Sequence, residues 1–279
     1  MKRWYIVLAI GISLISPATE AAERLLTIGG AVTEIVYALG KGNEIIANDI
    51  TSVYPEAALK LPKVGYMRTL SAEGLVSTNA SIIIAEAGAG PRNVLDQVRN
   101  AGIKVVQLSD GSHTPQQVAA DIRAIGKELN ASNTEKLASQ YESSWKQAES
   151  KLAGLPGQPR VLFVMNNSGR GAQVAGDETA ANAIIKLAHG ENVMAGQYKG
   201  YRPLTAEALV AAAPDVIVTT KEGLEASGGL QNFLKTPGIS MTPAGKSGRI
   251  ISMDTQYLLG FNPRLPEAVT ELAQAIRKP

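Results

Sequence analysis

The chain has 279 residues, of which 45% are hydrophobic and 19% charged, with a formal net charge of +2 and no cysteine. This length suits two ordinary domains or one large one. The near balance of charge gives no basis for a nucleic-acid surface, so we expect no nucleic-acid partner. Without cysteine, the fold must be held by core packing and not by disulfides.

The N-terminus has the three parts of a secretory signal. A basic pair, an apolar run over residues 4–15 and a small-residue region follow one another. The apolar run is too short for a stable membrane span, and cleavage after Ala18 or Ala21 fits the small-residue rule. We assign residues 1–21 to a signal peptide and expect a soluble protein of the bacterial periplasm with no stable membrane insertion.

Strand-like and helix-like segments alternate through the first half. Thr114 is the expected N-cap of a helix that starts at Pro115. Strands alternating with helices predict a parallel sheet with helices on both faces. The strands are expected at 25–28, from 45 onward, at 82–85 and at 104–108, and the helices at 32–39, 94–100 and 115–129.

One long helical stretch, residues 134–152, follows. It has no internal proline, and its apolar residues recur about every four positions, which is typical of a helix with one buried face. We expect a stiff helix that joins two α/β lobes. The resulting division is an N-terminal lobe at 22–130, an inter-lobe helix at 131–154 and a C-terminal lobe at 155–279.

The second half repeats the alternation of strands and helices. The strands are expected at 160–165, 216–219 and 249–253, and the helices at 179–187 and 266–277. The fold class is therefore α/β, with two lobes of mostly parallel sheet joined by a single long helix.

A phrase within residues 65–77 recurs within residues 200–211. Arg68 corresponds to Arg202, 134 residues later. Each copy runs from a loop through a Ser/Thr cap into an apolar run, so each is expected to open a helix. The repeat supports two lobes of one design and equates further pairs, Ser71 with Thr205, Glu73 with Glu207 and Leu75 with Leu209.

Catalytic and metal-binding patterns are weak. His113 and His189 are the only histidines, and neither has a second ligand at metal-binding spacing. The glycines do not match dinucleotide or phosphate-loop spacing, and no nucleophile elbow occurs. We therefore expect a protein that is not an enzyme.

Tyr66 is the side chain with the most suggestive surroundings. It lies in an expected loop, two residues before Arg68. A nearby cation favours the ionised phenol, and tyrosine is a known axial ligand of haem iron. Composition alone also fits an ordinary loop tyrosine packed on the surface.

The chain resembles the periplasmic haem-binding proteins of bacterial haem-uptake ABC transporters over nearly all of residues 24–279. Such proteins belong to a wider class that also carries ferric siderophores and cobalamin, and the resemblance implies the class III binding-protein fold. It is carried by Leu61 to Gly74, above all by Gly65-Tyr66-Met67-Arg68-Thr69-Leu70-Ser71-Ala72-Glu73-Gly74, and by the segments 27–35, 175–181, 201–204 and 236–239.

The resemblance implies haem as the transported ligand and Tyr66 as the axial ligand of its iron. Some relatives have a histidine in the loop after the first strand of the second lobe, where this chain has Asn166 and Asn167. An asparagine amide is a poor iron ligand, which leaves the second axial bond open. The side chains expected to support the haem site are Arg68, Lys221, Asn167, Tyr201 and Arg202.

Glu73 and Glu207 have a different implied role. In the resembling proteins a glutamate on each lobe docks against arginines of the permease dimer, which works with an ATPase. Both residues also stand in the first turn of an expected helix, where a carboxylate favours the helix dipole. The alternatives to haem delivery are a ferric-siderophore or cobalamin carrier of the same class and, in another class, a periplasmic enzyme.

Overall fold

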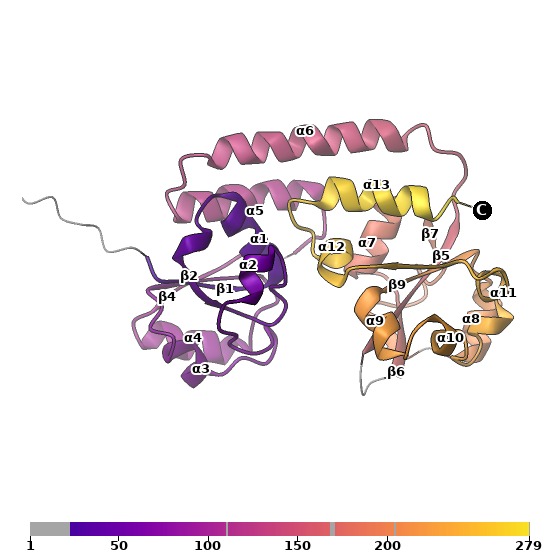
Figure 1. Ribbon diagram of the computed structural model, residues 1–279, viewed down its shortest axis with the longest axis horizontal. Helices are drawn as coiled ribbons and strands as arrows, with labels where there is room; N and C mark the ends of the chain where they lie inside the picture. Colours follow the sequence, from indigo (N-terminus) through magenta and orange to yellow (C-terminus); the bar gives the residue numbers. More distant parts are fainter. Residues whose placement is uncertain (1–22, 110, 168–170, 204, 279) are drawn as a thin grey trace, which may run out of the picture.

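The computed structural model describes residues 23–109, 111–167, 171–203 and 205–278. Two α/β lobes lie side by side, and the long helix α6 (Thr134–Leu152) runs along both of them (Figure 1). This confirms the predicted architecture of two lobes joined by one helix. The proposed signal peptide, residues 1–21, lies outside the described residues, and the domain limits at 130/131 and 154/155 stay predictions.

The N-terminal lobe is built on a four-stranded parallel sheet in the order β2-β1-β3-β4. All four residues of β1 and of β3 are buried, as expected for a parallel sheet covered on both faces. Leu25 packs into one buried cluster and Leu26 into another, on the opposite face. The elements of this lobe are β1 (Leu25–Ile28), α1 (Gly30–Ala38), η1 (Gly42–Glu44), β2 (Ile45–Asn48), α2 (Glu56–Leu59), α3 (Ala72–Val76), β3 (Ile82–Ala85), α4 (Arg92–Asn100), β4 (Lys104–Gln107) and α5 (Pro115–Glu128).

The C-terminal lobe has a six-stranded mixed sheet in the order β10-β9-β5-β6-β8, with β7 also paired to β5. Its strands are β5 (Arg160–Asn167), β6 (Gly171–Ala175), β7 (Glu191–Asn192), β8 (Tyr201–Pro203), β9 (Val216–Thr220) and β10 (Ile250–Met253). Its helices are α7 (Ala180–Leu187), α8 (Ala206–Ala212), α9 (Lys221–Ala226), α10 (Leu230–Phe233), η2 (Ile239–Met241), α11 (Pro243–Ser247), α12 (Thr255–Leu259) and α13 (Leu265–Ala275).

One sequence expectation is corrected in this lobe. The start of the second repeat copy was expected to be a loop, but residues 201–203 form strand β8, antiparallel to β6. The cause is the antiparallel pairing of β6 with β5, which leaves the other edge of β6 free to pair with Tyr201 and Arg202 through Ala175 and Val174.

The helix starts of the repeat are confirmed. The Ser71 hydroxyl accepts the Gly74 N–H at 3.1 Å, and the Thr205 hydroxyl accepts the Ala208 N–H at 3.2 Å. These bonds satisfy amide groups that the first helical turn leaves unpaired. Thr114 caps α5 in the same way, accepting the Gln117 N–H at 3.2 Å.

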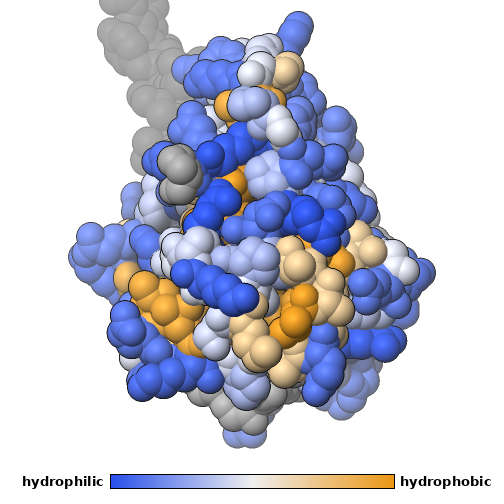
Figure 2. Space-filling view, turned by 90° about the vertical axis from the view of Figure 1, so that its right-hand side faces the viewer, coloured by the Kyte–Doolittle hydropathy of each residue, from blue (hydrophilic) through white to orange (hydrophobic). Residues whose placement is uncertain are grey.

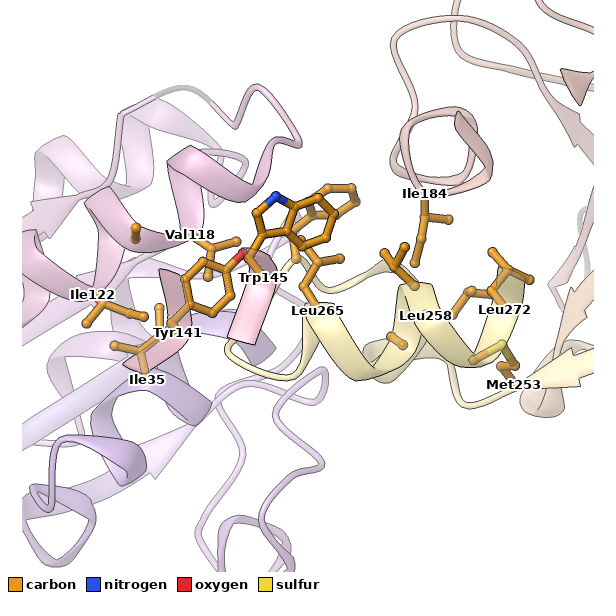
Figure 3. Packing of buried hydrophobic residues seen from close by; sticks show 14 of the residues in the cluster. Ile35, Val118, Ile122, Tyr141, Trp145, Ile184, Met253, Leu258, Leu265 and Leu272 are labelled. Carbon is orange, nitrogen blue, oxygen red and sulfur yellow. The ribbon is translucent and has the colours of Figure 1, made fainter. Parts of the chain in front are cut away.

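One of the buried apolar clusters runs from one lobe into the other along α6. Tyr141 and Trp145 are buried on its inner face (Figure 3). Figure 3 shows Val118 of the N-terminal lobe on one side of them and Leu265 of α13 on the other, within one buried cluster. The lobes are therefore joined by packing as well as by the covalent chain.

Candidate functional site

The carboxyl ends of the two sheets meet between the lobes. The Gln256 side chain, from the helix after β10, donates to the carbonyl of Gly30, just after β1, at 2.8 Å. It also accepts the Val53 N–H, in the loop after β2, at 3.1 Å. In α/β proteins, ligands bind beyond the carboxyl ends of the strands, so this boundary is the place to look for a site.

The Tyr66 loop is fixed by backbone hydrogen bonds on both sides. Ile50 N–H donates to the Gly65 carbonyl at 2.9 Å, and Gly90 N–H donates to the Met67 carbonyl at 2.9 Å. Met67 is also buried in the N-terminal core. Gly65 has a φ of 98°, which an L side chain rarely adopts, so the turn that presents Tyr66 favours glycine here.

The Tyr66 side chain faces solvent from this fixed loop. It is 41% exposed, and its hydroxyl makes no hydrogen bond to the residues that the structure describes. Further large apolar side chains of the same lobe are exposed, among them three within residues 50–54, and one of these, Ile50, is tied to the Tyr66 loop through Gly65. The three are Ile50 at 52%, Val53 at 37% and Tyr54 at 44%.

Arg68 lies against the loop that follows β3. A Cβ added to Gly88 would stand 3.2 Å from Nη1 of Arg68 and 3.3 Å from Nη2, so glycine leaves the space that the guanidinium occupies. The charge of Arg68 acts on Glu86 in its own lobe and on Tyr201 in the other. Arg68 is therefore a cation at the boundary of the two lobes.

Glu86 is an acidic residue on which the charge of Arg68 acts. Its carboxylate accepts the Ala31 N–H at the start of α1 at 2.9 Å. Burial raises the pKa of Glu86 to about 7, helped by the negative charge of Asp49 and opposed by the Ala31 hydrogen bond and the charge of Arg68. Gln107 donates to three carbonyls of the loop after β3, which holds Glu86 and Gly88 in place.

Tyr201 approaches the same boundary from the C-terminal lobe. Burial raises the pKa of Tyr201 to about 12, opposed by hydrogen bonds from the start of α7, at Ala181 and Thr179, and by the charge of Arg68. Its ring packs edge-on against Phe163, with the centroids 6.4 Å apart. Its hydroxyl is thus engaged within its own lobe, unlike that of Tyr66.

The other three residues predicted to support the haem site have separate surroundings in the C-terminal lobe. The Arg202 guanidinium stacks over the Tyr198 ring at 4.9 Å, so the repeat does not give Arg68 and Arg202 equivalent surroundings. Lys221 is exposed at the first position of α9, just beyond the carboxyl end of β9. Asn167 ends β5, where its backbone pairs with that of Gly171, and its side chain lies outside what the structure describes.

Glu73 and Glu207 are exposed in the first turns of α3 and α8. Neither forms an ion pair within the part of the chain that the structure describes. Figure 1 places α3 and α8 in different lobes, both on the side of the molecule away from α6. The two helices that carry these carboxylates thus lie on one side of the molecule.

Both histidines contact the C-terminal part of the chain. His113 packs against Phe261, with ring centroids 5.1 Å apart, and His189 follows α7 with its carbonyl accepting from Arg277 at 3.0 Å. The described residues contain no group of three or more histidine or acidic side chains arranged to hold a metal ion. Among those same residues, no helix combines the length and apolar character that crossing a membrane requires.

Sequence reasoning missed Glu86 and Gly88. A signal was present, because Glu86 directly follows the expected strand 82–85 and so had to lie at a carboxyl end. Gln256 was also missed, because it contacts Gly30 across 226 residues of chain.

The fold and the site together define a two-lobed binding protein of the α/β class. Residues 26–257 match the family described as periplasmic binding protein, and the chain belongs to this family. The chain is similar to the structure of the periplasmic heme-binding protein BhuT in complex with two hemes. The two share 42% identity and a TM-score of 0.86, over 91% of this chain and 97% of that one.

Two further relatives are named for two different ligands, heme and vitamin B12. The periplasmic heme-binding protein RhuT from Roseiflexus sp. RS-1 is 36% identical with a TM-score of 0.88, over 92% of this chain and 98% of that one. The vitamin B12-binding protein of Yersinia pestis is 26% identical over 210 residues, which cover 75% of this chain and 73% of its own. The haem-binding relatives are thus the more similar of the two kinds.

Proposed function

We propose that this protein binds haem and delivers it to an ABC importer of the inner membrane. The observation that carries the proposal is Tyr66, a solvent-facing tyrosine with an unpaired hydroxyl on a fixed loop, in a chain similar to haem-binding proteins. A phenolate is a hard oxygen donor that suits ferric iron.

The surroundings of Tyr66 fit the rest of the ligand. A porphyrin is flat and apolar, and the exposed side chains of Ile50, Val53 and Tyr54 offer apolar surface in the same lobe. Haem propionates are anions, and Arg68 is the guanidinium nearest to Tyr66 in the sequence and stands at the lobe boundary. Arg68 would pair with a propionate or support the phenolate of Tyr66.

Delivery of haem requires that the protein reach the periplasm and bind a transporter. A signal peptide over residues 1–21 would bring the protein to the periplasm, where a permease dimer with its ATPase would receive the haem. Glu73 and Glu207 would dock on the two permease subunits. Lys221, Asn167, Tyr201 and Arg202 stay predictions as supporting residues of the haem site, as does the absence of enzymatic activity.

The test of the ligand is a titration with haemin followed by visible absorption. The wild type should give the spectrum of a high-spin ferric haem ligated by tyrosinate. Tyr66→Ala should weaken haem binding strongly and change that spectrum. Tyr54→Ala, which removes another exposed tyrosine of the same lobe, is the matched control and should keep the tyrosinate spectrum.

Two results would count against the proposal. A Tyr66→Ala variant with wild-type affinity and spectrum would refute the ligand assignment. A wild type that binds cyanocobalamin and leaves haemin unbound would instead support the vitamin B12 alternative, which the similarity to the B12-binding protein of Yersinia pestis keeps open.

A further inference from the structure

Helices α3 and α8 present the same two kinds of exposed side chain. Glu73 and Glu207 each stand two residues after the cap of their helix, and Val76 and Val210 follow three residues later. Residues three apart lie on one helix face. Each helix therefore offers a carboxylate and an apolar side chain on the same side.

The match between the two helices extends to burial. Val76 is 38% exposed and Val210 is 39% exposed, while Leu75 and Leu209, just before them, are fully buried. Each leucine fixes how its helix is turned, so the two valines are presented to solvent in the same way. A single exposed valine would need no explanation, but valine is a modest helix former and here it recurs at equivalent places in both lobes.

A partner with two-fold symmetry fits this arrangement. One chain that carries the same small patch twice can meet two identical subunits with the same contact. Both helices lie on the side of the molecule away from α6 (Figure 1). The end view of the C-terminal lobe shows apolar surface in its lower half, at the level of α8, α10 and α11 (Figure 2).

We propose that Val76 and Val210 are a matched pair of apolar contacts that seat on the two equivalent subunits of the permease dimer, beside Glu73 and Glu207. The unpaired carboxylate next to each valine calls for a cation beside an apolar surface on each subunit. This inference rests on the proposed function, because it takes the haem permease as the partner.

The test measures binding of the haem-loaded protein to its permease–ATPase complex in nanodiscs. Val76→Ser and Val210→Ser should each weaken binding by about three- to eightfold, the effect of burying the exposed third or so of a valine. The double variant should lose at least about tenfold. Leu59→Ser is the matched control, since Leu59 is 53% exposed on α2, outside the repeat. This variant should bind the permease–ATPase complex as tightly as the wild type does.

Haemin titration and thermal unfolding of each variant show whether weaker binding to the permease comes from a lost contact, from lost haem binding or from unfolding. The valine variants should bind haemin and unfold as the wild type does, because neither side chain is buried or near Tyr66 in sequence. Binding of the double variant at wild-type strength, or a loss confined to one valine, would overturn the matched pair. A wild type that does not bind haemin would refute the proposed function instead.

Discussion

The ion pair between Glu34 and Arg264 joins the two lobes at a buried position. Glu34, on α1, is 3% exposed and accepts two hydrogen bonds from the Arg264 guanidinium, both at 2.8 Å. The guanidinium also stacks over the Tyr54 ring at 3.8 Å and the Tyr257 ring at 5.0 Å. We predict that Arg264→Ala destabilises the protein strongly at neutral pH.

The magnitude follows from what the substitution leaves behind. Removing one partner of a buried pair costs about 3–5 kcal/mol, because the other charge stays buried and uncompensated. The Arg264 side chain is 26% exposed, so water can partly replace it. We therefore expect a loss of about 2–4 kcal/mol in the free energy of unfolding.

The destabilisation by Arg264→Ala should also depend on pH, in a direction that follows from the pKa of Glu34. Burial raises the pKa of Glu34, and the hydrogen bonds and charge of Arg264 oppose this rise. Without Arg264 the pKa should rise further. A carboxyl whose pKa is raised on folding stabilises the fold at low pH and loses that contribution as pH increases through the folded pKa. The destabilisation by Arg264→Ala should thus be larger at about pH 8 than at about pH 5.

Denaturant unfolding at the two pH values measures the effect. Glu34→Gln in the Arg264→Ala background is the control, because a neutral amide needs no counter-charge and should recover part of the loss at the higher pH. An equal loss at both pH values, unrelieved by Glu34→Gln, would refute the electrostatic reasoning. It would assign the effect to the stacking of Arg264 on the two tyrosines.

Two further predictions concern the loop after β3. Because the pKa of Glu86 is raised to about 7, its contribution to stability is present at low pH and is lost as pH rises through 7. Glu86→Gln should therefore raise the melting temperature above about pH 8 and change it little near pH 5; a shift independent of pH would contradict this. Gly88→Ala should shift the Arg68 guanidinium by a few tenths of an ångström, because an added Cβ would meet its Nη1 at 3.2 Å. Haem should then dissociate faster, but by less than the roughly ten- to hundredfold increase that losing one charge-assisted hydrogen bond predicts for Arg68→Ala. The haem dissociation rate is measured by stopped-flow transfer of haem to apomyoglobin. The double variant Gly88→Ala, Arg68→Ala should lose haem at the same rate as Arg68→Ala alone. A faster loss from the double variant would show that Gly88→Ala does not act through Arg68.

Much of the fold could be predicted because local signals agree with the final packing. The strand at 82–85 was predicted with its observed bounds, and the caps at Ser71, Thr114 and Thr205 were found from residue type and position. Strand β8 was missed, because three residues carry no readable alternation and are ordered by pairing with β6.

The site was less accessible to sequence reasoning. Tyr66 was selected through a resemblance, since a loop tyrosine next to a cation is not specific by itself. The repeat equated Arg68 with Arg202, yet residues 66–69 form a turn, closed by the Thr69 N–H on the Tyr66 carbonyl at 2.9 Å, whereas Arg202 sits in a strand. The contacts of Arg68 with the Glu86 loop come from tertiary packing, which a pattern along the chain does not encode.

The packing of α13 on α6 has a consequence for the order of folding. Trp145 and Tyr141 lie near the middle of the chain, but Leu265, which covers them from the C-terminal side, belongs to α13 (Figure 3). During synthesis the apolar face of α6 therefore stays partly uncovered until nearly the whole chain is available. Such a nascent chain cannot complete its core early, and it keeps the apolar face of α6 partly exposed, where chaperones can bind, until residues 265–275 have been made.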